Sequence, residues 1–308
     1  MTMTLLEAAK LVSGDEIKRG VIELFAQNSE ILRVLPFMNI QGNALKYNVE
    51  EALPGVGFRG INEGYENSVG ILNPQTEGLV IAGGDLDVDK AIVDMQGAEV
   101  RTAHEALKIK ALAQLFTLKF IKGDNETDAR EISGLQARIQ GDQLLSAGNA
   151  SGGAALSLET LDELIDQVDN PTHLIMNKTM RRRLTQAARD PNVSGYLTYG
   201  RDEFGRQIAM YNDLPILIAD NIKSGESILN FDEASATGPA TSTSIYCVNM
   251  GDEGVMGLQN GGIQARDLGE LEGKPLFRTR VDWYCGMAIF QGRSAARLQH
   301  IANAAITS

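Results

Sequence analysis

The stretch Phe277-Arg278-Thr279-Arg280-Val281-Asp282-Trp283-Tyr284-Cys285-Gly286-Met287-Ala288 decides how the rest of this chain is interpreted. Its β-branched and aromatic residues predict a strand over residues 279–290. Further strands are predicted at residues 172–176, 208–210, 215–218 and 243–248. The chain is therefore rich in short strands near its carboxy terminus, and helices must fit between them.

Two helices alternate with those strands. Ser157 can cap the first, whose apolar stripe is Leu161, Leu164, Ile165 and Val168. Asn177 can cap the second, with Met180, Leu184 and Ala188 facing inward. The small residues of 148–153 mark the best internal boundary. We therefore expect an α+β body with a helix–strand–helix lobe inserted in its middle.

The clearest helix is predicted over residues 95–120. Ala103, Leu107, Ala111 and Leu115 share one face, which Leu112 and Phe116 widen. At ~1.5 Å per residue, such a helix is roughly 35–40 Å long.

A row of aspartates precedes this helix. Asp85, Asp87 and Asp89 have the spacing of a calcium loop, but Lys90 stands where that loop needs glycine, and Gln96 where it needs glutamate. Because Leu86 and Val88 alternate with the aspartates, the pattern favours a strand with a solvated acidic face.

Residues 39–84 predict a long hairpin. Leu45, Tyr47 and Val49 alternate with polar residues, a glycine-rich stretch follows, and residues 79–82 are expected to return as the second strand. The tip is expected to be wide and polar. A two-stranded hairpin is marginal in water by itself, so this one must rest on another surface, such as a second copy of the chain.

The amino-terminal residues 1–36 predict two short amphipathic helices. Their apolar stripes are Leu5, Leu6, Ala9 and Val12, then Ile17, Val21, Leu24 and Phe25. Helices this short are not stable alone, so they must dock on the body or on a neighbour.

Composition limits the classes of function. The chain has 308 residues, 43% of them hydrophobic, and a net charge of −12. An acidic chain repels phosphate, which argues against a nucleic-acid binder. The sequence has neither a signal peptide nor an apolar run that could span a membrane. The cysteines, Cys247 and Cys285, lack metal-site spacing, so we expect buried free thiols in a reducing cytosol.

No catalytic, cofactor-binding or metal-binding motif emerges. His104, His173 and His300 are isolated from one another. There is no G-x-S-x-G elbow and no Walker loop. The basic run 181–183 is interpreted as a solvated helix face or a contact to an acidic neighbour. The sequence thus indicates a protein that is not an enzyme and needs no cofactor.

Several segments, taken in order, resemble the major capsid proteins of tailed bacteriophages with the Hong Kong 97-type fold. In chain order, these segments are residues 35–37 leading to 42–44, 57–59, 214–216 before 220–222, 243–246 before Gly251, 277–288 and 293–297. The resemblance implies an N-terminal arm (1–36), an extended loop (37–84), a peripheral domain with a long spine helix (85–150), an axial domain (151–262) and C-terminal strands completing the peripheral domain (263–308).

The resemblance also implies function and partners. Copies of the chain would form hexamers and pentamers of an icosahedral head, made in the host bacterial cytoplasm, which encloses DNA without reading its sequence. Expected partners are a portal protein and a separate scaffolding protein, while a decoration or cement protein is left open. Candidate contacts between copies are Ile17, Val21, Phe25, Lys46, Arg59, Glu63, Tyr65 and Glu66. Lys46 is the only lysine of the hairpin and lies near its base, so no lysine–asparagine bond is expected.

Two alternatives stay open. An encapsulin, a cellular compartment with the same fold, would hold an enzyme cargo instead of a genome. A soluble α+β enzyme could use Glu63, Glu66 and Asp85 as its acidic groups.

Overall fold

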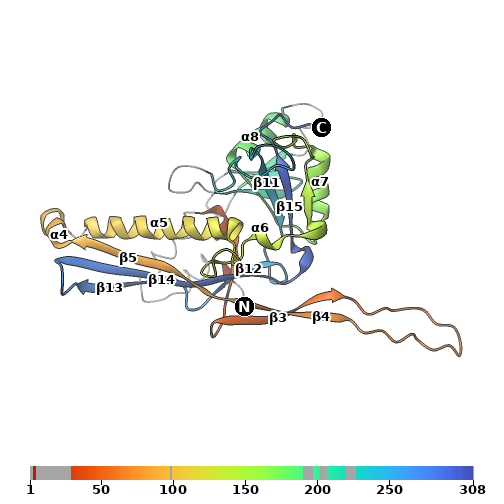
Figure 1. Cartoon of the computed structure of the whole chain (residues 1–308), viewed down its shortest axis with the longest axis horizontal. Coiled ribbons are helices and arrows are strands. Elements are labelled where there is room, and N and C mark those ends of the chain that lie inside the picture. Colours follow the sequence, from red (N-terminus) through yellow and green to blue (C-terminus); the bar gives the residue numbers. More distant parts are fainter. Residues whose placement is uncertain are drawn as a thin grey trace.

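The computed structural model describes residues 3–4, 29–97, 99–189, 197–201, 205, 207–219 and 227–307. Three β-structures organise them: a six-stranded sheet, a seven-stranded sheet and a two-stranded hairpin. The two sheets form a body from which the hairpin projects, away from the end that carries α4 and β13 (Figure 1).

The six-stranded sheet is built around β14 (Leu276–Ile289), which contains the stretch quoted first. β14 pairs with β5 (Val80–Asp89) over ten residues, from Leu276 opposite Asp89 to Cys285 opposite Val80. The remaining strands are β13 (Gln264–Glu270), β12 (Val255–Gln259), β2 (Pro36–Asn39) and β1 (Met3–Thr4). The predicted strand is confirmed, and so is the strand character of Asp85 to Asp89.

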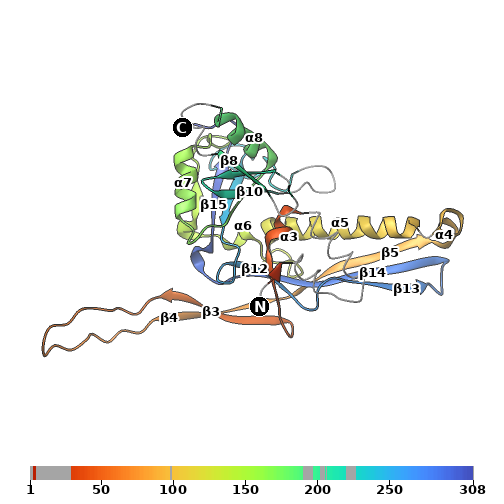
Figure 2. The same ribbon diagram turned by 180° about the vertical axis from the view of Figure 1, so that it is seen from behind.

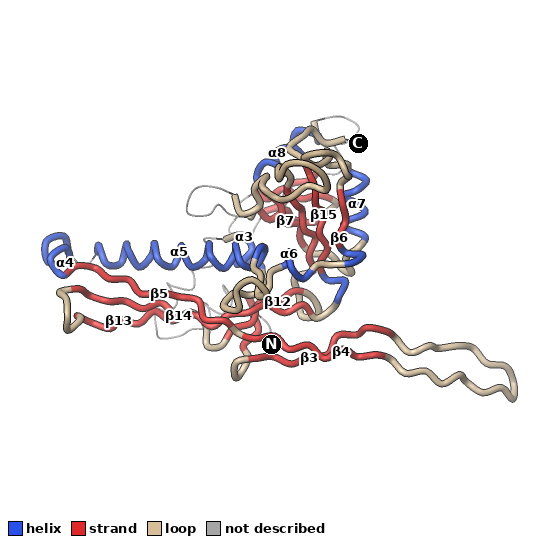
Figure 3. Tube along the Cα trace, in the orientation of Figure 1, coloured by secondary structure: helices blue, strands red, loops and turns tan. Residues whose placement is uncertain are grey.

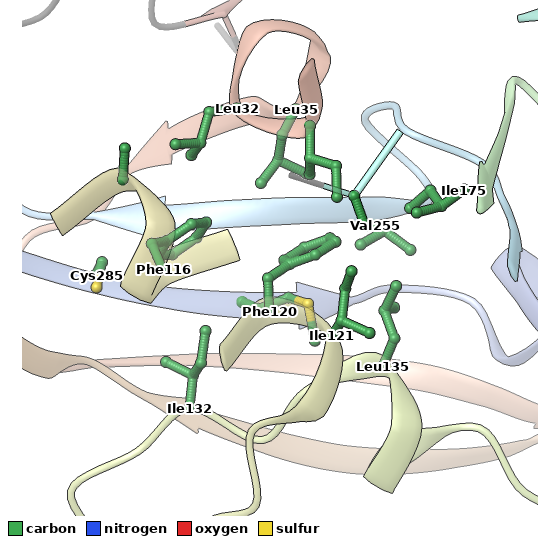
Figure 4. Packing of buried hydrophobic residues seen from close by; sticks show 14 of the residues in the cluster. Leu32, Leu35, Phe116, Phe120, Ile121, Ile132, Leu135, Ile175, Val255 and Cys285 are labelled. Atoms are coloured by element: carbon green, nitrogen blue, oxygen red, sulfur yellow. The ribbon is translucent and has the colours of Figure 1, made fainter. Parts of the chain in front are cut away.

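The long helix α5 (Glu99–Lys122) covers one face of this sheet. Trp283 of β14 is fully buried beneath it, with ring centroids 4.8 Å from Phe116 and 5.6 Å from Phe37. The surrounding core joins α5 to α3, β12 and β7 (Figure 4). A side chain at Gly257 would collide with the Phe37 ring of the adjacent strand, so glycine is required there.

The long helix departs from the prediction in two ways. It begins at Glu99, because Gly97 has a φ of 90° and separates it from a short helix, α4 (Lys90–Gln96). The predicted apolar face is also wrong in part: Leu112 and Phe116 are buried as predicted, but Ala103, Leu107, Ala111 and Leu115 are exposed, Leu107 by 63% and Leu115 by 45%. The buried residues of the helix are Ile109, Leu112, Ala113, Phe116, Thr117, Phe120 and Ile121. The helix has apolar residues on two faces. The face that carries Phe116 and Phe120 packs against the sheet.

The seven-stranded sheet forms the upper lobe (Figure 2). Its strand order is β6 (Leu144–Ser146), β15 (Ala295–Ile301), β11 (Thr243–Val248), β7 (His173–Met176), β10 (Leu214–Ile218), β9 (Gln207–Tyr211) and β8 (Leu197–Arg201). Helices α7 (Leu158–Asp166) and α8 (Lys178–Ala187) pack on it. Both predicted caps are confirmed: Ser157 accepts from the Glu159 amide at 3.2 Å, and Asn177 from the Met180 amide at 2.7 Å.

Strands from the predicted segments 151–262 and 263–308 do not stay in separate sheets. β12, in the segment assigned to the inserted lobe, pairs with β14 of the other sheet. β15, in the segment assigned to the body, pairs with β11 of the lobe. A division at residues 262 and 263 therefore does not follow the sheets, because strand pairing is decided by contacts distant in sequence.

Short helices connect the sheets. In α3 (Glu30–Val34), Ser29 is the N-cap and also accepts a hydrogen bond from Thr117 of α5 at 2.9 Å. The carboxylate of Glu30 accepts from the Ile218 amide of β10 at 2.6 Å. α3 is thus bonded to both parts of the body, while α6 (Leu135–Arg138) packs near the end of α5.

The hairpin consists of β3 (Ala44–Ala52) and β4 (Ile71–Gly78), with a wide loop between them (Figure 3). The predicted first strand is confirmed, but the predicted return strand is wrong. Residues 79–82 lead into and begin β5, which belongs to the body. They are more apolar than β4 but pair with β14 rather than β3: Val80 and Ala82 are half-buried against the core, whereas Ile81 is 74% exposed.

Candidate assembly surfaces

The base of the hairpin is fixed to the body by a polar network. Arg138 of α6 donates to both carboxylate oxygens of Glu77, at 2.5 and 2.7 Å. The Tyr47 hydroxyl donates to the Ile289 carbonyl oxygen at 3.1 Å and lies 3.4 Å from Glu77. Burial, reinforced by the Glu77 charge, raises the pKa of Tyr47 above its ordinary value. The charge-assisted bonds hold β3 and β4 at a defined angle to the body.

A small apolar cluster lies under the same base. Ile40, Leu258 and Ala288 are buried there, and Leu45, Leu79 and Phe290 pack against them. The Tyr47 ring meets Phe290 edge-on at a centroid distance of 4.9 Å. The predicted alternation along β3 is confirmed, because Leu45, Tyr47 and Val49 are half-buried while Lys46 and Asn48 are exposed.

The tip of the hairpin is shaped by local polar contacts. Arg59 donates to the Glu63 carbonyl oxygen at 3.1 Å, and its guanidinium lies 5.2 Å from the Tyr65 ring centroid. The Glu63 carboxylate accepts from the Gly60 amide at 2.7 Å. Ser68 donates to the Gly55 carbonyl oxygen at 2.8 Å across the loop. These groups define a loop shape but offer no buried interior.

The tip also carries a set of apolar side chains, so the prediction of a polar tip is wrong. These residues are almost wholly exposed: Leu53, Val56, Phe58, Ile61 and Val69. Phe58 is fully exposed and Val56 is 96% exposed. Five large apolar side chains on a projecting loop are characteristic of a contact surface. Their exposure could have been predicted from their position in a glycine-rich loop, because a two-stranded hairpin has no core that could bury them.

The residues predicted as contacts fall into two groups. Lys46, Arg59, Glu63, Tyr65 and Glu66 are exposed on the hairpin, Lys46 in β3 opposite Thr76 and the other four in the loop. The other predicted contacts, Ile17, Val21 and Phe25, lie outside the described residues.

The acidic groups considered for an enzyme are not brought together. Glu63 and Glu66 lie at the hairpin tip, whereas Asp85 lies in β5 of the body. Asp85 receives two hydrogen bonds from Arg280, at 2.6 and 2.9 Å, which lower the pKa of its carboxyl. Arg278 binds Asp87 in the same way, at 2.6 Å for both bonds. The acidic face of β5 is thus matched by arginines of β14.

Several titratable groups of the core have strongly shifted pKa values. Burial raises the pKa of the Cys247 and Cys285 thiols to about 12 and lowers that of His173 to about 4. Both cysteines are buried and free, as predicted. In the described ranges, no three His, Cys, Asp or Glu side chains are grouped to hold a metal ion, and no helix is long and apolar enough to cross a membrane.

The chain is similar to known proteins in part of its sequence and in its fold. Residues 13–157, a little under half of the chain, match the family described as Major capsid protein GP7. No curated protein matches the sequence. The SrpI encapsulin of Synechococcus elongatus PCC 7942 is 17% identical with a TM-score of 0.66, over 100% of this chain and 99% of that one.

Two further solved structures share the fold. The capsid of a native GTA particle is 12% identical with a TM-score of 0.66, over 89% of this chain and 91% of that one. A chain from Microbacterium phage Oxtober96 is 12% identical with a TM-score of 0.63, over the same shares. At these identities the likeness concerns the arrangement of helices and strands.

Proposed function

We propose that this chain, a major capsid protein with the Hong Kong 97-type fold and not an enzyme, is the subunit of an icosahedral bacteriophage head. Copies assemble into hexamers and pentamers, and the closed shell encloses double-stranded DNA. The observation that carries this proposal is the β3–β4 hairpin, which projects from the body and exposes an apolar tip.

The exposed apolar tip gains free energy when another surface covers it. Burying a large apolar side chain contributes about 1.5–3 kcal/mol, and five such residues are exposed here. A second copy can cover them, while its own hairpin reaches the next copy. Each contact can be weak, because several contacts per subunit act together through multivalency.

The sheets suggest an assignment of domains. We assign the six-stranded sheet and α5 to the peripheral domain, with α5 as its spine helix. The seven-stranded sheet with α7 and α8 is assigned to the axial domain, β3–β4 to the extended loop and the segment before Ser29 to the N-terminal arm. This assignment follows strand pairing rather than the boundaries at residues 150 and 262.

The remaining partners follow from this role. A head needs a portal, and a separate scaffolding protein is proposed to guide closure, with a decoration protein as a further outer partner. The acidic balance of −12 keeps the wall from adhering to DNA phosphates, so the genome is enclosed without sequence-specific binding. The protein is then found in the virion after assembly in the bacterial cytoplasm.

Sedimentation and electron microscopy of the purified full-length chain test this function. Megadalton particles or free capsomers of five and six subunits are expected, whereas a chain that stays a monomer or small dimer under all assembly conditions contradicts the proposal.

The encapsulin alternative has its own support, because SrpI matches the whole chain. Genes beside the coding sequence separate the two. Portal and terminase genes support a phage head, and a ferritin-like or peroxidase cargo gene supports an encapsulin.

A further inference from the structure

The helix α7 of the upper lobe exposes an acidic stripe. Leu161, Leu164 and Ile165 are buried on one side of the helix. The opposite side carries four exposed carboxylates at helical spacing: Glu159, Asp162, Glu163 and Asp166. Residues three and four apart lie on the same face of a helix, so these charges form one continuous row.

The helix α8 of the same lobe exposes a basic stripe. Met180 and Leu184 are buried, whereas Lys178, Arg181 and Arg182 are exposed. Arg183 points elsewhere and donates to Asn303 at 3.1 Å. Within the described part of the chain, no ion pair involves Lys178, Arg181 or Arg182.

Neither stripe is explained by the stability of its own helix. Like charges four residues apart repel each other, as for Glu159 with Glu163 and Lys178 with Arg182. The helix dipole makes this worse, because cations at the N-terminus of α8 and Asp166 at the C-terminus of α7 each meet a helix end of their own sign. An opposing surface of opposite charge relieves this repulsion in both helices.

We propose that α8 of one copy contacts α7 of a second copy through these two stripes. The proposal rests on the assembly function above and specifies the contact that joins lobes within a capsomer. α7 lies along one side of the lobe and α8 across its far end (Figures 1 and 2). A copy can therefore use α7 toward one neighbour and α8 toward another. Such head-to-tail contacts form a ring when the rotation between successive copies closes after five or six subunits, as the proposed capsomers require.

A second copy is the occupant that the charges favour over DNA. DNA would match α8 but would be repelled by α7, whereas a second copy matches both helices with residues of this chain. Exposed charge pairs set register and speed of association and are screened by salt. The contact therefore specifies which faces meet, while the apolar surfaces hold them together.

Charge reversal tests the contact on the full-length chain. Capsomer and particle formation are measured by native mass spectrometry and sedimentation for Arg181→Glu/Arg182→Glu, for Glu159→Lys/Glu163→Lys, and for all four substitutions together. Each double variant is expected to assemble at least about tenfold more slowly than wild type, because attraction becomes repulsion. The fourfold variant exchanges the signs and is expected to recover most of that loss.

Thermal unfolding of each variant shows whether the lobe still folds. Lys110→Glu/Arg130→Glu, which changes the net charge by the same amount as the α8 variant at exposed positions of other elements, is the control for that variant. Unchanged assembly of both double variants, or no recovery in the fourfold variant, overturns the contact. Normal assembly with weaker DNA retention in the α8 variant alone also overturns it, in favour of DNA. If wild-type chain forms no oligomer, the assembly function itself fails.

Discussion

The six-stranded sheet and the hairpin that continues from it are stabilised in opposite ways. In the sheet, Trp283 has no exposed surface, and Phe37 and Phe116 pack against it. In the hairpin, Phe58 and Val56 contact mostly solvent. The two regions are joined by residues 40–43 between β2 and β3, and by Leu79 alone between β4 and β5. The sheet buries its apolar side chains within one chain, whereas the hairpin tip leaves them exposed for the contacts that we propose between copies.

This contrast means that folding and assembly can be separated by mutation. Substitutions in the sheet should lower the free energy of unfolding and affect assembly only through loss of folded chain. Substitutions at the tip should leave unfolding nearly unchanged and affect assembly directly. The hairpin base, with Tyr47, Glu77 and Arg138, lies between these extremes.

The largest effect on stability is expected from Trp283→Ala. Truncating a fully buried tryptophan leaves a cavity among Phe37, Phe116 and Gln259, which costs about 3–5 kcal/mol. Urea unfolding of the monomer measures it. Trp283→Phe, which keeps a ring, should cost clearly less; equal losses for the two variants would show that ring packing is not what stabilises the sheet.

The next effect is a pH dependence of the upper lobe. Burial lowers the pKa of His173 to about 4. As pH falls below about 6.5, the unfolded chain binds a proton that the folded chain does not bind. Stability present above that pH is therefore lost by about 1.4 kcal/mol per pH unit down to pH ~4. Comparing thermal unfolding of wild type and His173→Asn over this range isolates the contribution, and identical pH profiles would contradict it.

A smaller loss is expected at the hairpin base. Arg138→Met removes the two charge-assisted bonds to Glu77 and should cost about 1.5 kcal/mol. Hydrogen exchange in β3 and β4 should become faster, because the strands lose their attachment to α6. Arg130→Met, at an exposed loop position, is the matched control. Unchanged exchange in Arg138→Met would show that the apolar cluster alone fixes the hairpin.

The smallest effect on unfolding but a large one on assembly is expected from Phe58→Ser. An exposed substitution changes stability by about 0.5 kcal/mol or less. Particle yield should fall strongly, because the tip loses its largest apolar side chain. Phe58→Leu should retain particles. If the serine variant assembles as well as wild type, Phe58 does not contribute to the contact between copies.

No effect at all is expected from Lys46→Arg on covalent structure. Lys46 lies in β3 near the base, and the loop between the strands contains no lysine. Denaturing gels and mass spectrometry of mature particles should show single subunits with either residue. Ladders of linked subunits that disappear in the arginine variant would refute this expectation.

The lobe was the part most readily predicted from sequence. Ser157 and Asn177 each cap a helix whose stripe has a single apolar face, so local signals and burial agree. α5 was harder, because Leu107 and Leu115 are as apolar as Ile109 and Leu112. Which face is buried depends on the position of Trp283, nearly 170 residues further along the chain.

The hairpin shows the converse difficulty. Residues 79–82 look more like a strand than β4, which contains Pro74 and several polar residues, yet β4 pairs with β3. A strand paired on one side tolerates proline and polar residues. The exposed apolar tip was missed for the same reason, since hydrophobicity was interpreted as burial within one chain. At the tip the apolar side chains are exposed instead, where we propose that another copy covers them.

The near-continuity of β4 and β5 has a mechanical consequence. Together they run from Ile71 to Asp89, roughly 60 Å of extended chain at ~3.3 Å per residue. A pull on the tip therefore enters the body along the strand axis. The ten-residue register with β14 then carries the load in shear, with many hydrogen bonds sharing the force instead of breaking one at a time. In the proposed shell, tension on the hairpin tip is therefore carried along β5 into the six-stranded sheet of the same chain.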